Sequence, residues 1–241
     1  MKQSPSTEIA WGGSWSRAQR RRCHEVAKSV VTFVGDFASE NAIEIREPKR
    51  FTFVQGRPSS PIKGLCSDAR SIRLILNKHH VSRGEFEESS FEILETGAHE
   101  SVHAYRFERY PDHLKEWPDY AEHSVHEGLA YASGVIAFRP NTSTVGLVDL
   151  ARSIELVDPE VDAFQPEELA RNIRLMIDGR YDESRYGYYL RNRPGRHNIC
   201  ESMGLVAITT LLDNNVPFSD ILDAPADQVM HTAADIIDSN E

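Results

Sequence analysis

The sequence predicts an α+β fold, with a mixed N-terminal lobe and a helical C-terminal lobe. Within roughly the first 80 residues, a helical pattern is followed by short β-type runs, and from about residue 90 onwards every regular pattern is helical. Such segregation of strands and helices is typical of α+β chains. The connections are short, so we expect one domain over 14–241, with lobes at about 14–110 and 111–241, after a loose polar tail at 1–13.

The mixed lobe should begin with an amphipathic helix over about 16–39, where apolar residues recur at steps of three and four. Its strands are indicated by short β-type runs, and in the last of them Ile72, Leu74 and Leu76 alternate so that they share one face. The turn-rich stretch over 56–64 reads as an exposed loop. The expected strands are 42–46, 51–55 and 71–77.

The next helix is predicted over about 90–109, with Ser89 or Ser90 as its cap and Pro111 as its stop. Another should begin near Pro118, a favourable first-turn residue, and end at about residue 136. Further helices are expected at about 145–156, 166–178, 198–213 and 225–238, with an aromatic and arginine-rich connector over 181–197.

Composition and charge exclude several classes of protein. The chain is 40% hydrophobic and 27% charged, which is globular composition, and it has no apolar run of about 18 residues. Its formal net charge of −10 makes nucleic acid and anionic lipid poor partners. The N-terminus lacks the apolar core of a secretory signal, and three widely spaced cysteines form no disulfide framework, so we expect a reducing, cytoplasmic setting.

The strongest chemical signal is an H-E-x-x-H motif, at His99-Glu100-Ser101-Val102-His103. Residues four apart on a helix lie one above the other, so both imidazoles project the same way and can take two corners of a zinc tetrahedron. Glu100 is rotated one step further, where a general base for a zinc-bound water belongs. The motif therefore predicts one Zn²⁺ per chain.

Catalytic zinc normally has a third protein ligand. The extended pattern H-E-x-x-H-x-x-G-x-x-H fails, because Arg106 and Arg109 stand where it needs Gly and His. The following helix offers Glu127 as the best candidate, with His123, one turn earlier on the same face, as the second choice. Small residues at Gly128 and Ala130 are expected to let this helix pack close to the first one.

H-E-x-x-H followed after a loop by E-G-L-A, at residues 127–130, resembles the gluzincin metallopeptidases, and in particular a small bacterial group of predicted zinc-dependent proteases. The resemblance covers about residues 90–135. It implies a zincin-like fold, zinc ligation by His99, His103 and Glu127, and zinc-dependent hydrolysis of peptide or protein substrates with Glu100 as the base.

The oxyanion of the reaction needs a second stabilising group besides zinc. Tyr186, Tyr188, Tyr189 and His197, all in the connector, are candidates. Gly187-Tyr188 resembles a G-Y motif found late in such proteases, and this resemblance favours Tyr188. Tyr131, one turn after Glu127, is one candidate for a partner that orients an imidazole.

Two functions other than peptide hydrolysis are also compatible with the sequence. A catalytically silent zincin-like domain for binding or regulation is the main alternative, although such a domain has no need of Glu100. A nucleic-acid or partner-binding module would use Arg17, Arg20, Arg21 and Arg22, which read more simply as a solvated helix face. Cys200 near His197 suggests a nucleophile and base, but without an orienting third group we expect a buried structural thiol.

Overall fold

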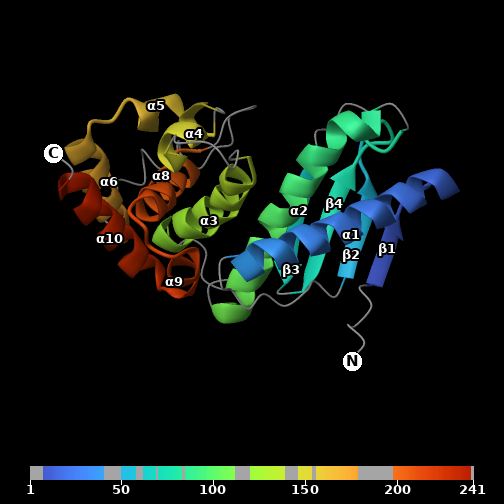
Figure 1. Cartoon of the computed structure of the whole chain (residues 1–241), viewed down its shortest axis with the longest axis horizontal. Helices are drawn as coiled ribbons and strands as arrows, with labels where there is room; N and C mark the ends of the chain where they lie inside the picture. Colours follow the sequence, from blue (N-terminus) through green and yellow to red (C-terminus); the bar gives the residue numbers. More distant parts are fainter. Residues whose placement is uncertain are drawn as a thin grey trace. The chain divides into compact units, whose positions relative to one another are not determined.

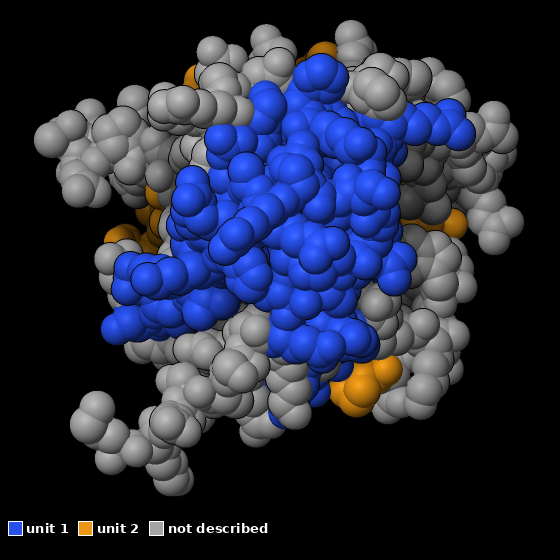
Figure 2. Space-filling model, turned by 90° about the vertical axis from the view of Figure 1, so that its right-hand side faces the viewer, with its two compact units in different colours: residues 1–110 blue, residues 111–241 orange. Residues whose placement is uncertain are grey.

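The computed structural model describes residues 8–40, 50–57, 62–68, 70–82, 85–111, 120–138, 146–153, 156–178 and 198–239 (Figure 1). The α+β prediction is confirmed, because one small mixed sheet accompanies many helices. The chain divides into two compact units, unit 1 (Met1–Tyr110, blue in Figure 2) and unit 2 (Pro111–Glu241, orange).

Unit 1 contains a four-stranded sheet made of β1 (Glu8–Gly12), β2 (Arg50–Gln55), β3 (Lys63–Asp68) and β4 (Ser71–Leu76), in the order β1-β2-β4-β3. The strands β1, β2 and β4 run parallel, and β3 runs antiparallel to β4. Among the described strands, β3 is therefore the last on its side of the sheet.

Two long helices, α1 (Arg17–Glu40) and α2 (Glu85–Arg109), cover one face of this sheet (Figure 1). Alternate residues of β2 and β4 point towards them and are buried, as the period-two pattern predicts. Gly97 of α2 allows a close approach to α1, since a Cβ there would lie 2.5 Å from Cγ2 of Val30. Helices and sheet share one apolar core, which includes Val26, Val30, Phe51, Phe53, Ile72, Leu74, Leu76, Ile93 and Ala98.

Two strands were not expected from the sequence. Residues 8–12, assigned to the loose tail, form β1, because Ile9 and Trp11 pack against the core while the backbone pairs with β2. β3 occupies the end of the predicted 56–64 loop and continues past it. The expected strands at 51–55 and 71–77 match β2 and β4, and the expected strand at 42–46 lies outside the described residues.

The predicted helix at 90–109 is present as α2 but begins at Glu85, so Ser89 and Ser90 lie inside it and do not cap it. Acidic residues before Ser89 favour this earlier start, because carboxylates stabilise the positive end of a helix dipole. Its end at Arg109, just before Pro111, agrees with the prediction.

In its described residues unit 2 is helical, and it contains α3 (Tyr120–Phe138), α4 (Leu147–Ser153), α5 (Pro159–Asp162), α6 (Pro166–Ile177), α8 (Ile199–Asp213), α9 (Phe218–Asp223) and α10 (Ala226–Ser239). The predicted helices at 145–156, 166–178, 198–213 and 225–238 correspond to α4, α6, α8 and α10. Pro118 lies outside the described residues, and α5 and α9 are short helices that the sequence pattern did not indicate.

The central helix of unit 2 is α8, and almost all of its residues are buried. Asn198 caps its start through a reciprocal capping box with Glu201. A Cβ on Gly204 would lie 1.8 Å from the carbonyl oxygen of Ser124, and one on Gly128 would lie 2.4 Å from the carbonyl carbon of Gly204. Backbone therefore meets backbone where α3 and α8 cross, and no side chain fits between them.

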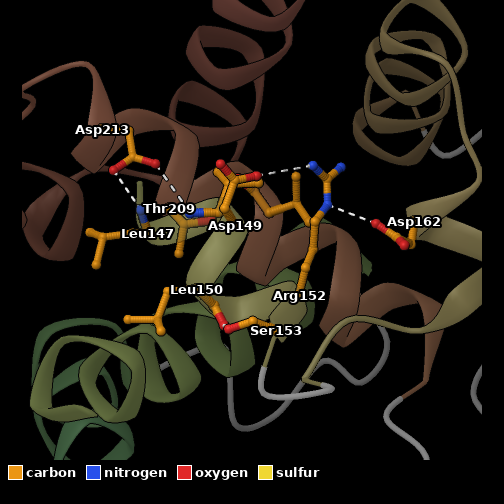
Figure 3. Close-up of polar contacts among 10 residues, drawn as sticks. Leu147, Asp149, Leu150, Arg152, Ser153, Asp162, Thr209 and Asp213 are labelled. Atoms are coloured by element: carbon orange, nitrogen blue, oxygen red, sulfur yellow. Dashed lines mark hydrogen bonds and ion pairs between the residues drawn. The ribbon is translucent and has the colours of Figure 1, made fainter. Parts of the chain in front are cut away.

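Figure 3 shows how α4 is tied to the rest of unit 2. Both carboxylate oxygens of Asp213, at the end of α8, accept hydrogen bonds from the first turn of α4, at 2.8 Å from Leu147 N and 3.1 Å from Val148 N. This remote cap satisfies two backbone donors that no intrahelical carbonyl can reach. At the other end, the Arg152 guanidinium pairs with Asp162 at 2.7 Å.

None of the helices in the described ranges combines the length and the apolar character needed to cross a membrane.

Candidate metal centre

The two histidines of the H-E-x-x-H motif converge at the middle of α2. Their Nε2 atoms lie 2.9 Å apart, and the rings are nearly perpendicular, with centroids 4.5 Å apart. The spacing of four residues on a helix produces this convergence, because both side chains project from the same face one turn apart. His103 is 6% exposed and His99 is half-buried, so the pair faces a site of limited access to solvent.

This arrangement suits a divalent metal ion. Ligand atoms of His99, Glu100 and His103 all lie within 4.8 Å of one another and form a group that could hold a metal. Two imidazole nitrogens on a tetrahedral zinc are separated by about 3.3 Å, so the observed 2.9 Å requires only a small opening of the pair. Two nitrogens and a carboxylate are also a donor set that zinc accepts.

Glu100 lies between α2 and the sheet. Its side chain is 6% exposed and rests on β3, where its Oε1 atom lies 2.3 Å from the position that a Cβ on Gly64 would occupy. A buried carboxylate beside two imidazoles can exchange a proton with a molecule that is bound next to the imidazoles. Sequence reasoning missed Gly64, although an isolated glycine within a short strand often marks a close approach.

The same side of α2 continues with a buried cation. Arg106, one turn after His103, is the largest fully buried side chain among the residues described, and its guanidinium carbon lies 4.4 Å from the centroid of the Tyr110 ring. Stacking of this kind stabilises a cation that has left water. The sequence excluded Arg106 as part of an extended zinc motif, but its burial was not foreseen.

The predicted third ligand belongs to unit 2. Glu127 lies on α3 and is half-buried, as are His123 and Tyr131, which occupy the same face at steps of four. Gly128 packs against α8 within unit 2, where an added Cβ would meet Gly204 and Leu205, and the expected approach of α3 to α2 stays a prediction. Pairing of glycines across helices cannot be assigned from spacing alone, since any neighbouring helix can supply the partner. Ligation by Glu127 stays a prediction.

The predicted oxyanion stabilisers lie outside the described residues. Tyr188, with its alternatives Tyr186, Tyr189 and His197, falls in the segment 179–197. These assignments also stay predictions.

The arginine cluster at the start of α1 makes contacts within unit 1. The guanidinium carbon of Arg20 lies 5.4 Å from the centroid of the Trp11 ring. Arg21 forms an ion pair with Glu25 at 3.7 Å, and Arg22 donates a hydrogen bond to the carbonyl oxygen of Val81. These contacts agree with a solvated helix face rather than with a dedicated binding patch.

Burial makes the cysteine thiols poor nucleophiles. It raises the pKa of Cys23, Cys66 and Cys200 from 9.0 to about 12, and for Cys66 the negative charge of Glu100 adds to the effect. Cys200 is fully buried, which agrees with a structural thiol.

We expect Cys66 to resist alkylation in the native protein and to react faster in Glu100→Gln. A pKa of about 12 in place of 9.0 lowers the thiolate fraction at pH 8 about a thousand-fold, and neutralising Glu100 removes one cause of that shift. The rate of iodoacetamide labelling at Cys66, followed by mass spectrometry of its peptide, measures the effect. Equal rates in both proteins would show that the Glu100 charge does not reach the thiol.

No protein-family model, no curated protein and no solved structure matches the chain.

Proposed function

We propose that the protein is a zinc-dependent peptidase of the zincin type, in which His99 and His103 hold the metal and Glu100 is the general base. The single observation that carries this proposal is the convergence of the two Nε2 atoms to 2.9 Å with the Glu100 carboxylate beside them. A helix that merely exposed two histidines and a glutamate would have no reason to bury Glu100 and His103 in one cluster.

Each residue of the proposed site has its own role in the reaction. When bound, zinc supplies Lewis acidity, which activates a water and polarises the carbonyl of the scissile bond. His99 and His103 present their Nε2 lone pairs, and Glu127 is the proposed third ligand. Glu100 accepts the proton of the attacking water and passes it to the nitrogen of the leaving amine. Tyr188 is the proposed hydrogen-bond donor to the oxyanion.

The sheet supports a peptide as the substrate. β3 is the last described strand on its side, so its outer edge presents backbone groups that an extended peptide can pair with. Glu100 rests on this strand at Gly64, which would bring the bond of a paired peptide near the base.

Metal analysis of His103→Ala tests the proposal. The purified native protein should carry about one zinc per chain, whereas His103→Ala should bind zinc more than about 100-fold more weakly, because a direct ligand is lost. His231→Ala is the matched control, since it removes an exposed imidazole from α10. Inductively coupled plasma spectrometry and competition with a chelating dye measure content and affinity.

Equal zinc in the native protein and in His103→Ala would remove the metal centre from the proposal. One zinc per chain without cleavage of unfolded or short peptides would favour the silent binding domain. Glu127→Ala, analysed in parallel, tests the third ligand, and unchanged zinc affinity in that variant would eliminate Glu127.

A further inference from the structure

Among the unit 1 glycines whose surroundings the structure describes, Gly64 makes the closest contact, with Glu100. A Cβ on Gly64 would lie 2.3 Å from Oε1, 2.4 Å from Cγ and 2.6 Å from Cδ of Glu100. Real Cβ atoms do not approach other heavy atoms so closely, so the Glu100 side chain occupies space that exists only because residue 64 has no side chain.

Two other glycines of unit 1 leave more room for a Cβ. At Gly12, also in a strand, the nearest atom would lie 3.3 Å from an added Cβ, and at Gly35, on α1, nothing lies within 4 Å. Glycine weakens a strand by about 0.5–1 kcal/mol relative to alanine. At Gly64 the space left by the missing side chain is occupied by Glu100, which gives a reason for a glycine at this position.

Cys66 is the next residue of β3 on the face that carries Gly64, because it lies two residues after Gly64. The negative charge of Glu100 contributes to raising the pKa of the Cys66 thiol, after the larger effect of burial. The carboxylate is therefore packed along β3 rather than turned towards solvent, in agreement with its 6% exposure.

We propose that Gly64 is a positioning residue of the hydrolytic site: its bare Cα lets the carboxylate of Glu100 lie against β3, at the position from which it serves as the base. The inference rests on the proposed function. A methyl group at residue 64 would force the carboxylate to move by about 1 Å to reach ordinary contact, and a misplacement of that size can cost about 100-fold in rate.

Little stability should be lost in Gly64→Ala. The clashing atoms belong to the outer part of one long side chain, which can rotate away without moving any backbone. Gly97→Ala is the matched control, because it adds the same methyl group elsewhere in unit 1 with a similar overlap, at 2.5 Å. There the obstacle is Val30, a stiff β-branched side chain packed between the helices, so α2 itself must shift.

A double-mutant cycle tests the proposal on zinc-loaded protein. Gly64→Ala should lower kcat about 10- to 100-fold with little change in KM and with zinc content retained. Glu100→Asp, one methylene shorter, should also lower kcat, but its added cost in the Gly64→Ala background should be several-fold smaller, because a shorter side chain escapes the clash. In Gly97→Ala the melting temperature should fall more than in Gly64→Ala.

Three results would overturn the proposal. The first is a kcat of Gly64→Ala within two-fold of the native value. The second is that Gly64→Ala and Glu100→Asp lower kcat by factors that simply multiply in the double variant. The third is that Gly64→Ala and Gly97→Ala lose activity in proportion to their loss of stability. Crystal structures of the native protein and Gly64→Ala supply a readout without catalysis, namely a displacement of the Glu100 carboxylate by about 1 Å. If the native protein cleaves no peptide, the proposed function fails, and these two structures alone decide the positioning.

Discussion

Glu100→Gln should abolish peptide hydrolysis while zinc content stays at about one per chain. Glutamine has nearly the same size as glutamate, so the buried position against β3 can be kept, but its amide cannot accept the proton of the attacking water. Loss of a general base costs about 100- to 10,000-fold in rate. Initial rates on an unfolded protein substrate and metal analysis of the same preparation measure both quantities.

The matched control for this prediction is Glu92→Gln. Glu92 lies on the same helix, two turns before Glu100, and is exposed, so the change removes one charge without touching the histidine pair. Its activity should stay within two-fold of the native rate. Activity of Glu100→Gln above a tenth of the native rate would remove Glu100 from the role of base, and a parallel loss of zinc would make it a ligand instead.

Gly204→Ala should destabilise unit 2 by about 2–3 kcal/mol, a typical cost of overpacking a core. The added methyl group would lie 1.8 Å from the carbonyl oxygen of Ser124, which is backbone of α3 and cannot rotate away. The helices must therefore separate and lose packing along their whole contact. Chemical denaturation followed by circular dichroism measures the change.

Gly35→Ala is the control for this glycine. Gly35 is exposed on α1 with nothing within 4 Å of an added Cβ, so alanine should raise the stability of unit 1 by about 0.5–1 kcal/mol through helix propensity. Opposite signs at the two positions would show that steric contact, and not the residue type, decides the outcome. A neutral Gly204→Ala would mean that α3 and α8 are less closely packed than their backbones indicate.

The sequence predicted those elements whose burial leaves a periodic trace. α1 and α2 each bury one stripe, and β2 and β4 bury alternate residues, so apolar spacing reveals them. β1 and β3 leave no such trace. β1 has only Ile9 and Trp11 to bury, and it depends on backbone pairing with β2, which is distant in the sequence. β3 exposes Leu65, and it depends on backbone pairing with β4, which follows it after a turn.

The candidate site was predictable to the extent that it is local. His99, Glu100 and His103 lie within one helical turn, and helix geometry alone brings their side chains together. Gly64 could not be found in this way, because its importance depends on which strand comes to lie beneath Glu100. The contact of Gly128 with α8 could not be found from the sequence for the same reason, since spacing along one helix does not identify the helix that packs against it.

The crossing of α3 and α8 has a consequence for biosynthesis. Gly128 and Gly204 are about 75 residues apart, so unit 2 cannot close its core until the nascent chain has emerged beyond α8. The core of unit 1 is complete by the end of α2. We therefore expect unit 1 to acquire its tertiary structure first, while the chain is still on the ribosome. At that stage α8 has not been synthesised, so the apolar surface of α3 is exposed and chaperones can bind it.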